Sequence, residues 1–535
     1  MKKKLIAASA GVVASGALFF GGAPYYFGGQ AEQVLADQYR LLQENGFLTV
    51  ESRRYERGWF ESTETLEVRL KPSLLNNAGN YLPDNLKTVL SEPVTVINHV
   101  KHGPFADGLQ PAAARVESEF VYSPEAGKVL KRFFGEQAPV TLTNTIGLGG
   151  GGRLNLSVPA FDYEELSGIA LNWKGLSGET SYTSGWAGFK SNYQAPLLHI
   201  KLADKGDIRM ENLQIGSDTY DSPSKLAVGS SSFKLDKLSL QWQEGIDYNI
   251  KLNIIRFFFQ QLNLPKNIKL NELVNLVTDL QIGAFINPTG TVPPSKITVS
   301  KLQFDTRMNE EGGWANTEGR FRFDRLAYGD ENYGPLDIEV AAEHLEAKSL
   351  LAIKRTMAEV ASKNMSEDEI QKALLHTARN EASGLFTGNP IIKIRTFDFT
   401  LPKGKIHADG QLSFNGLSKA DLDDVSLMLK KTRADFKFDL PEPLLEDMAV
   451  SQARSLFTVN PEDEAAGTAS MEDINETLRL MVKSTVNVMA DNGYLTLKDD
   501  NVATRVEIAQ GQLKLNGKVF ESEAEPEFDD EGAAP

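Results

Sequence analysis

Five segments of the chain repeat one pattern of apolar and polar residues: apolar, polar, apolar, two polar, apolar, polar, apolar. Each half of the pattern alternates with a period of two, which is typical of a β-strand with one buried face. The segments are residues 208–215, 233–240, 297–304, 321–328 and 392–399. Their spacing along the chain is irregular, so the pattern does not indicate a solenoid of fixed period.

The doubled polar pair in the middle of each segment bears on the geometry of the sheet. In a regular strand, two adjacent polar residues place the apolar residues of the second half on the opposite face. A β-bulge at the pair adds one residue and keeps all four apolar side chains on one face of a strongly curved sheet. The alternative is a strand that leaves one sheet and enters a second. Both interpretations predict a long antiparallel sheet whose apolar face is covered or occupied.

The rest of the chain predicts a fold that is mainly β with a few helices (α+β), built on a large curved antiparallel sheet or sheets with bulged strands. Further strand patterns lie at residues 94–100, 141–146, 154–158 and 406–414. We expect helical segments near residues 32–44, 355–383, 444–457 and 474–489. The first ends at Asn45-Gly46, a common helix stop, and Ser366 and Glu369 have the spacing of a capping box.

The N-terminus predicts a transmembrane anchor. Lys2 to Lys4 precede an uncharged stretch of 23 residues, 5–27, which is long enough to cross about 30 Å of hydrocarbon. The lysines favour a cytoplasmic N-terminus, which places the bulk of the chain in a bacterial periplasm. A cleaved secretory signal has similar charged and apolar regions and is the alternative. We favour an uncleaved signal anchor over residues 1–28, because the small-residue run Ala8-Ser9-Ala10 follows too few apolar residues.

Composition narrows the class of protein further. The chain has no cysteine, which excludes disulfides, thiolate metal sites and a cysteine nucleophile. Its 535 residues are enough to bury a large core, which we expect to be one β-rich periplasmic domain over residues 29–520. The net charge of −16 argues against nucleic acid as a partner. Residues 521–535 are rich in acidic side chains and are expected to form a disordered tail.

The candidate metal and phosphate sites have simpler interpretations. Residues 147–152 are glycine-rich, but they lack the Lys-Ser/Thr ending of a phosphate-binding loop and are expected to form a flexible hairpin. His99 and His102 lie at the end of a predicted strand, where their side chains should diverge, and no nearby residue completes a metal site. The sequence therefore predicts no metal and no cofactor.

The run Tyr55-Glu-Arg-Gly-Trp-Phe60 is more distinctive. Aromatic residues beside an Arg-Gly turn are able to form a binding platform close to the membrane. They are equally suited to plug the end of the sheet. We favour the plug, because large aromatic side chains are chiefly core material.

These and later motifs resemble the YdgA-like family, which are proteobacterial proteins of unknown function anchored in the inner membrane and exposed to the periplasm. The motifs are Tyr55-x-Arg57-Gly58-Trp59-Phe60-x-Ser62, His102-Gly103-Pro104-Phe105, Trp173-Lys-Gly175-Leu176-Ser-Gly178, Tyr333-Gly334-Pro335-Leu336-Asp337 and Leu513-x-Leu515-Asn516-Gly517-Lys518. The resemblance implies a large β-rich periplasmic domain, and it transfers no catalytic or binding residue. It leaves possible interaction or structural landmarks at Arg57, Trp59, Phe60, His102, Trp173 and Tyr333.

We therefore expect an envelope protein that is structural or binding rather than catalytic, with the inner membrane as its partner through residues 5–27. The alternative is binding or transfer of lipid or another amphipathic ligand along a curved apolar β-groove. The partner, apart from the membrane, is then a lipid or an envelope protein. An uncovered apolar face favours the groove, and two sheets packed face to face contradict it. A second alternative is an envelope hydrolase, which a Ser-His contact or a cleft with perturbed carboxylates favours.

Overall fold

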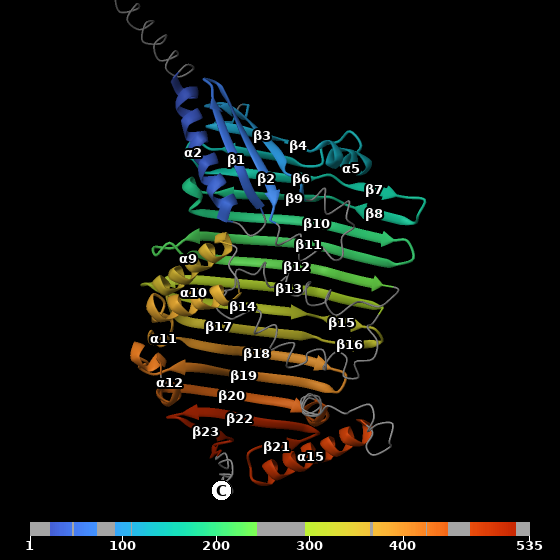
Figure 1. Cartoon of the computed structure of the whole chain (residues 1–535), viewed down its shortest axis with the longest axis vertical. Helices are drawn as coiled ribbons and strands as arrows, with labels where there is room; N and C mark the ends of the chain where they lie inside the picture. Colours follow the sequence, from blue (N-terminus) through green and yellow to red (C-terminus); the bar gives the residue numbers. More distant parts are fainter. Residues whose placement is uncertain are drawn as a thin grey trace, which may run out of the picture.

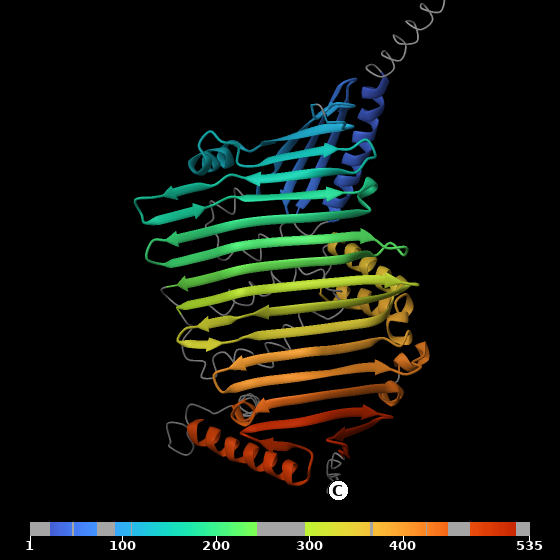
Figure 2. The same cartoon turned by 180° about the vertical axis from the view of Figure 1, so that it is seen from behind.

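The computed structural model describes residues 22–44, 48–71, 91–108, 110–242, 295–363, 367–423, 425–447 and 471–520. Within these residues, 24 strands join in one sheet, and the ladders between neighbouring strands are antiparallel. The strands are stacked along the long axis of the molecule (Figures 1 and 2). The predicted class, mainly β with a long antiparallel sheet and a few helices, is confirmed.

The central ladder follows the chain with few exceptions. Its first part runs in the order β1 (Leu48–Arg57), β2 (Glu61–Leu70), β3 (Val94–His102), β4 (Ala114–Val121), β5 (Thr141–Ile146), β6 (Gly152–Val158), β9 (Leu176–Tyr182), β10 (Gly188–Leu202), β11 (Gly206–Asp221) and β12 (Ala227–Trp242). It continues through β13 (Lys296–Glu311), β14 (Trp314–Phe323), β17 (Leu336–Glu346), β18 (Ile391–Leu401), β19 (Gly404–Phe414), β20 (Thr432–Pro441), β22 (Asn501–Ala509), β23 (Gln512–Leu515) and β24 (Lys518–Val519). Short strands pair beside these: β7 (Phe161–Glu164), β8 (Ile169–Trp173), β15 (Arg325–Tyr328), β16 (Glu331–Tyr333) and β21 (Thr496–Lys498).

The helices confirm most of the predicted helical segments. They are α2 (Ala23–Glu44), α5 (Pro124–Phe134), α9 (Ala347–Lys363), α10 (Glu367–Asn380), α11 (Gly384–Thr387), α12 (Val425–Lys431) and α15 (Met471–Asp491), with short 3-10 turns η2 (Ser184–Trp186) and η3 (Lys419–Asp423). The helix predicted near 355–383 is in fact two main helices, and the first begins earlier, at Ala347. Of the segment predicted near 444–457, residues 448–457 lie outside the described part, as does Ser366 of the predicted capping box.

The N-terminal prediction falls largely on residues that the structure does not describe. Among the described residues, no helix combines the length and the apolar character that a membrane crossing needs. Helix α2 begins at Ala23, near the end of the predicted anchor, and residues 1–21 lie outside the described part. The acidic tail, 521–535, lies outside it as well.

Helices pack on the apolar face of the sheet. Val34 and Leu35 of α2 form a buried cluster with Val100 and Val116 of β3 and β4. Further along the sheet, α9 contributes Leu350 to a second buried cluster. Helices α9 and α10 lie in front of the strands in Figure 1 and behind them in Figure 2. Around β14, β17 and β18 the opposite face carries ion-paired side chains, because successive side chains of a strand alternate between faces.

The doubled polar pairs of the first four repeated segments lie side by side in the sheet. The ladder between β11 and β12 skips one pair of residues, Asn212 opposite Asp236, and resumes in the same register beyond it. The ladder between β12 and β13 is interrupted at the same level, where it skips Asp236 and Lys301. In the next strand, Asp324 separates β14 from β15, and both pair with β13. Asn212 and Lys301 have positive φ angles of 53° and 56°, so the backbone leaves the β conformation there. Neither a shift of register nor a second sheet is found in these four segments.

The two halves of the interrupted strands nevertheless share a face. Phe323 precedes the interruption, and its ring lies 6.1 Å from that of Phe399 in β18. Leu326 follows the interruption and packs with Phe399 against one buried cluster. The fifth segment confirms the predicted bulge, because the register of β18 shifts on both sides at Arg395 and Thr396.

Candidate functional site

An apolar row crosses ten neighbouring strands on the face that α9 covers at one end. The strands are β10 to β14, β17 to β20 and β22, and each contributes one residue that is paired with the residue contributed by the next strand. In order, the residues are Tyr193, Ile215, Phe233, Phe304, Phe321, Ile338, Phe397, Ala408, Phe438 and Thr504. Met308, which shares a face with Phe304, packs against the cluster that contains α9. At about 4.8 Å between strands, the row extends for about 43 Å.

Part of this face is open to solvent. Ile215 in the row is 44% exposed, and two further aliphatic residues on the same face, Val340 and Ile392, are 42% and 47% exposed. Most of the aromatic residues of the row are half-buried. Within the described residues, the sheet is single, so the face-to-face packing that would contradict the groove is not present there.

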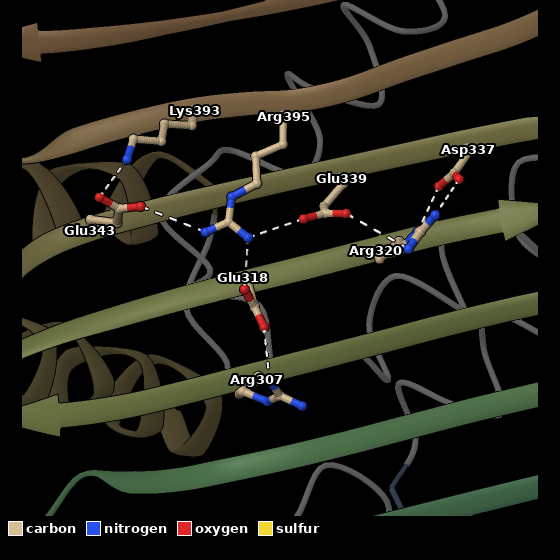
Figure 3. A network of polar contacts seen from close by, with 8 residues as sticks. All are labelled: Arg307, Glu318, Arg320, Asp337, Glu339, Glu343, Lys393 and Arg395. Atoms are coloured by element: carbon tan, nitrogen blue, oxygen red, sulfur yellow. Dashed lines mark hydrogen bonds and ion pairs between the residues drawn. The ribbon is translucent and has the colours of Figure 1, made fainter.

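The opposite face carries a network of ion pairs, drawn in Figure 3. Arg395 lies at its centre, with Nη1 2.9 Å from Glu318 and 3.0 Å from Glu339, and Nη2 3.6 Å from Glu343. Four cations face four carboxylates, and the remaining members are Arg307, Arg320, Asp337 and Lys393. The charges therefore balance, and this face is not a built anion or cation site.

The bulge in β18 explains how Arg395 reaches three carboxylates. Arg395 lies at the shift of register, so it is not paired with a residue of either neighbouring strand. A bulge re-aims the side chain of its extra residue. The guanidinium consequently lies between carboxylates of two strands, Glu318 on β14 and Glu339 and Glu343 on β17.

Hydrogen bonds in the network stabilise the charged forms of Asp337 and Arg395. Hydrogen bonds from Arg320 keep the pKa of Asp337 below its usual value, with Nε 2.8 Å from Oδ1. The carboxylates of Glu339 and Glu318 raise the pKa of Arg395. A shallow hollow of about 760 Å³ adjoins the network, and its lining includes serines and Gly319 as well as these charged groups. Such a surface suits a solvated outer face.

Four of the predicted landmarks meet at one corner of the sheet. Arg57 and His102 end β1 and β3, and Trp59 and Phe60 lie in the turn between β1 and β2. The N-terminal end of α2 completes the corner, because Arg57 Nη2 donates to the carbonyl oxygen of Tyr25 at 2.6 Å. Figure 1 shows this end of α2 beside the tips of the first strands.

His102 is the buried centre of this corner. Its Nδ1 lies 3.0 Å from the carbonyl oxygen of Trp59, which accepts a hydrogen, so Nε2 accepts the hydroxyl hydrogen of Ser62 at 2.9 Å. A Cβ on Gly28 of α2 would lie 2.5 Å from the imidazole Cε1, so α2 covers the ring closely. Burial lowers the pKa of His102. Sequence reasoning identified His102 and missed the roles of Ser62 and Gly28.

The predicted plug is wrong for Trp59 and Phe60, whereas Tyr55 of the same run packs against the buried cluster beneath α2. Trp59 is 53% exposed and Phe60 is 57% exposed, so neither ring fills the end of the sheet. The ring of Trp59 instead lies 5.0 Å from that of Tyr25. The turn itself is tight, because a Cβ on Gly58 would lie 2.3 Å from the carbonyl oxygen of Glu61.

The two remaining landmarks lie elsewhere. Trp173 ends β8, where it pairs with Phe161 of β7 and Leu198 of β10, far along the strands from α2 (Figure 1). Tyr333 of β16 is buried in a cluster with Leu401, and its hydroxyl donates to Glu331. The fold does not bring either residue to the corner.

A buried polar chain under α2 was missed by the sequence reasoning. Glu64 is 1% exposed, and its carboxylate accepts hydrogen bonds from Arg53 and Asn98, each at 2.7 Å. Ser118 donates to the other end of Asn98 at 2.6 Å. These residues come from four neighbouring strands, so only their pairing brings them together.

The histidine pair and the glycine-rich segment are arranged as the sequence predicts. His99 and His102 diverge, since His99 is exposed beside Glu119 while His102 is buried. Residues 147–152 connect β5 and β6 as a hairpin, closed by a hydrogen bond from Gly147 to Gly151. In the part of the chain that the structure describes, no group of three His, Asp or Glu side chains is arranged to hold a metal.

Comparison with known proteins gives one family. A family model described as "Bacterial protein of unknown function (DUF945)" matches residues 1–523. No curated protein and no solved structure matches this chain.

Proposed function

The chain belongs to the bacterial family of unknown function DUF945, and from its structure we propose that it is a membrane-anchored envelope protein that binds lipid acyl chains along the apolar face of its sheet. Residues 5–27 provide the anchor in this proposal, and the sheet lies in the periplasm, as the resemblance to YdgA-like proteins implies. The observation that carries the proposal is the apolar row that crosses ten strands.

The geometry of the row suits an acyl chain. One acyl chain at full extension spans about half of a hydrocarbon core that is about 30 Å thick. The row is about 43 Å long, so it accommodates such a chain. An acyl chain needs no hydrogen bond, and the row crosses strands whose backbones are already paired on both sides. The exposure of Ile215, Val340 and Ile392 provides apolar contact area within reach of a ligand.

The same face offers less to a peptide strand. Strand addition needs the free edge of a sheet. The row lies in the interior of the sheet, where strands such as β11 and β18 are paired with a neighbour on each side. The charged face is unsuited to acyl chains, since its ion pairs remain in contact with water.

We infer binding rather than catalysis. The Ser62-His102 contact is the feature that most favours the hydrolase, but Ser62 is 4% and His102 is 8% exposed beneath α2. In a serine hydrolase the second imidazole nitrogen faces a carboxylate that stabilises the imidazolium. Here it faces the carbonyl oxygen of Trp59, so the pair is better explained as a hydrogen-bonded tie within the corner.

Site-specific photo-crosslinking in the native envelope tests the proposal. A benzophenone amino acid replaces Ile215 or Val340 on the apolar face, and Gln214 or Gln411 on the charged face serves as the matched control. We expect phospholipid adducts, identified by mass spectrometry, at positions 215 and 340 and not at 214 and 411. Crosslinks from 215 and 340 to protein, whether another chain or another part of this one, would contradict lipid as the occupant.

A further inference from the structure

We propose that Tyr25, Tyr26, Trp59, Phe60 and Phe105 form an interfacial patch that rests in the headgroup layer of the anchoring membrane and fixes the tilt of the sheet. The five side chains are between 47% and 69% exposed. They belong to the start of α2, the turn between β1 and β2, and the loop after β3. The inference rests on the proposed anchor and adds a second contact with the same membrane.

The patch is held in place by its neighbours. The rings of Tyr25 and Trp59 lie 5.0 Å apart, and the guanidinium of Arg57 lies 4.2 Å from the ring centre of Tyr25. The carbonyl oxygen of Trp59 accepts a hydrogen bond from His102, and that of Phe60 accepts one from the His102 backbone at 2.8 Å. The aromatic groups therefore have an ordered backbone beneath them, which limits the entropy lost on contact with a surface.

The composition of the patch favours a membrane interface over a protein partner. Tryptophan and tyrosine combine an apolar ring with a polar group, and they are enriched where hydrocarbon meets water. Trp59 contributes an indole N–H, while Tyr25 and Tyr26 contribute hydroxyl groups. The experiment below measures contact between Trp59 and lipid directly.

The position of the patch identifies the membrane. The apolar sequence 5–27 ends at the first turn of α2, and Tyr25 and Tyr26 lie within that turn. Aromatic residues at the end of an apolar span are expected at the interface on that side. Because Trp59 contacts Tyr25, the turn between β1 and β2 lies at the same depth, and the first strands then point their tips toward the bilayer.

The test uses the full chain in vesicles of phosphatidylethanolamine and phosphatidylglycerol whose acyl chains carry bromine close to the headgroup. Bromine quenches tryptophan emission at short range. We expect the vesicles to quench the wild-type protein, Trp59→Phe to lose this quenching, and Trp173→Phe to retain it. Trp173 is the matched control because it lies opposite Leu198 of β10, ten residues along that strand from Gly188, and is not part of the corner. Phe60→Trp in the Trp59→Phe background should restore the quenching.

Flotation after an alkaline wash separates failure of the patch from failure of the anchor. Protein that leaves the vesicles overturns both the anchor and the patch. Protein that stays with the vesicles, but whose quenching is the same in Trp59→Phe and the wild type, keeps the anchor and overturns the patch. Quenching that follows Trp59 supports the patch.

Discussion

The hydroxyl oxygen of Ser62 lies 2.9 Å from Nε2 of His102, and both groups are buried where α2 meets the sheet. The contact joins the two sequence motifs that surround the Trp59 turn and the end of β3. Gly28 of α2 lies against the imidazole that this contact holds in place, so the position of the ring limits how closely α2 packs on the sheet. The corner that carries the exposed aromatic patch is therefore built around one neutral histidine.

Docking of α2 should depend on pH through His102. Burial lowers the pKa of this imidazole; nearby Arg57 lowers it further, and the carbonyl of Trp59 and the charge of Glu61 oppose the shift. Above about pH 6.5 the ring is neutral in both the folded and the unfolded chain, so the corner has its full stability. As the pH falls below that value, the unfolded chain binds a proton before the folded chain does, and stability is lost.

Hydrogen exchange of the α2 amides, corrected for intrinsic rates, measures this effect. Between pH 7.5 and 5.5 we expect protection of α2 to fall in the wild-type protein and to fall less in His102→Gln, whose side chain does not titrate. His99→Gln is the control, because His99 is exposed beside Glu119. An unchanged pH dependence in His102→Gln would assign the effect to another group.

Gly28→Ala should loosen the same corner without changing any charge. The new Cβ would lie 2.5 Å from Cε1 of His102, and the ring is fixed by two hydrogen bonds, so α2 has to move. Overpacking of this kind costs about 1–3 kcal/mol. Gly127→Ala in α5 is the matched control, since its Cβ would meet nothing within 4 Å, and helix propensity predicts a gain of up to about 1 kcal/mol. Urea unfolding monitored separately at α2 and α5 by hydrogen exchange compares the two; equal effects would contradict the close packing.

Local alternation in the sequence predicted the sheet, because a strand with one apolar face is recognisable without knowledge of its neighbours. The bulge at Arg395 was predicted in the same way, from the doubled polar pair. The first four pairs look the same in sequence but keep their register, and the chain turns at Asn212 and Lys301 through positive φ angles instead. Pattern alone does not distinguish these two backbone solutions.

The candidate sites depend on pairing between strands, which the pattern leaves open. The segments that contain Phe304 and Phe321 were recognised one by one, yet their alignment into a row needs the register of each ladder. Likewise, Trp59 and His102 were identified as landmarks, while their contact and the cover from Gly28 join positions far apart in sequence. The exposure of Trp59 then reversed the prediction of a plug.

Glu64→Gln should be the more damaging of two carboxylate substitutions in β1 and β2. Glu64 is buried and binds Arg53, so removing its charge leaves a largely enclosed guanidinium without its partner. Breaking a buried pair costs about 3–5 kcal/mol, and the partial exposure of Arg53 suggests the lower end. Glu51→Gln, which breaks the exposed pair with Arg69, should cost less than about 1 kcal/mol. Urea midpoints measured side by side test this; similar midpoints would show that Glu64 is better solvated than its burial indicates.

Arg395→Gln should expose the mutual repulsion of the three carboxylates that surround Arg395. Without the guanidinium, fewer positive charges lie near the carboxylates of Glu318, Glu339 and Glu343, which are all partly solvated. We expect a loss of about 1 kcal/mol at low salt, because exposed pairs are individually weak and only their combination counts.

The loss should shrink as salt is raised toward 1 M, where the Debye length falls to about 3 Å. Arg54→Gln, which breaks the single exposed pair with Glu56, should change stability little at any salt concentration. Thermal unfolding of the three proteins over a salt series makes the comparison. A loss in Arg395→Gln that does not depend on salt would mean that Arg395 acts through the packing of the bulge in β18 rather than through its charge.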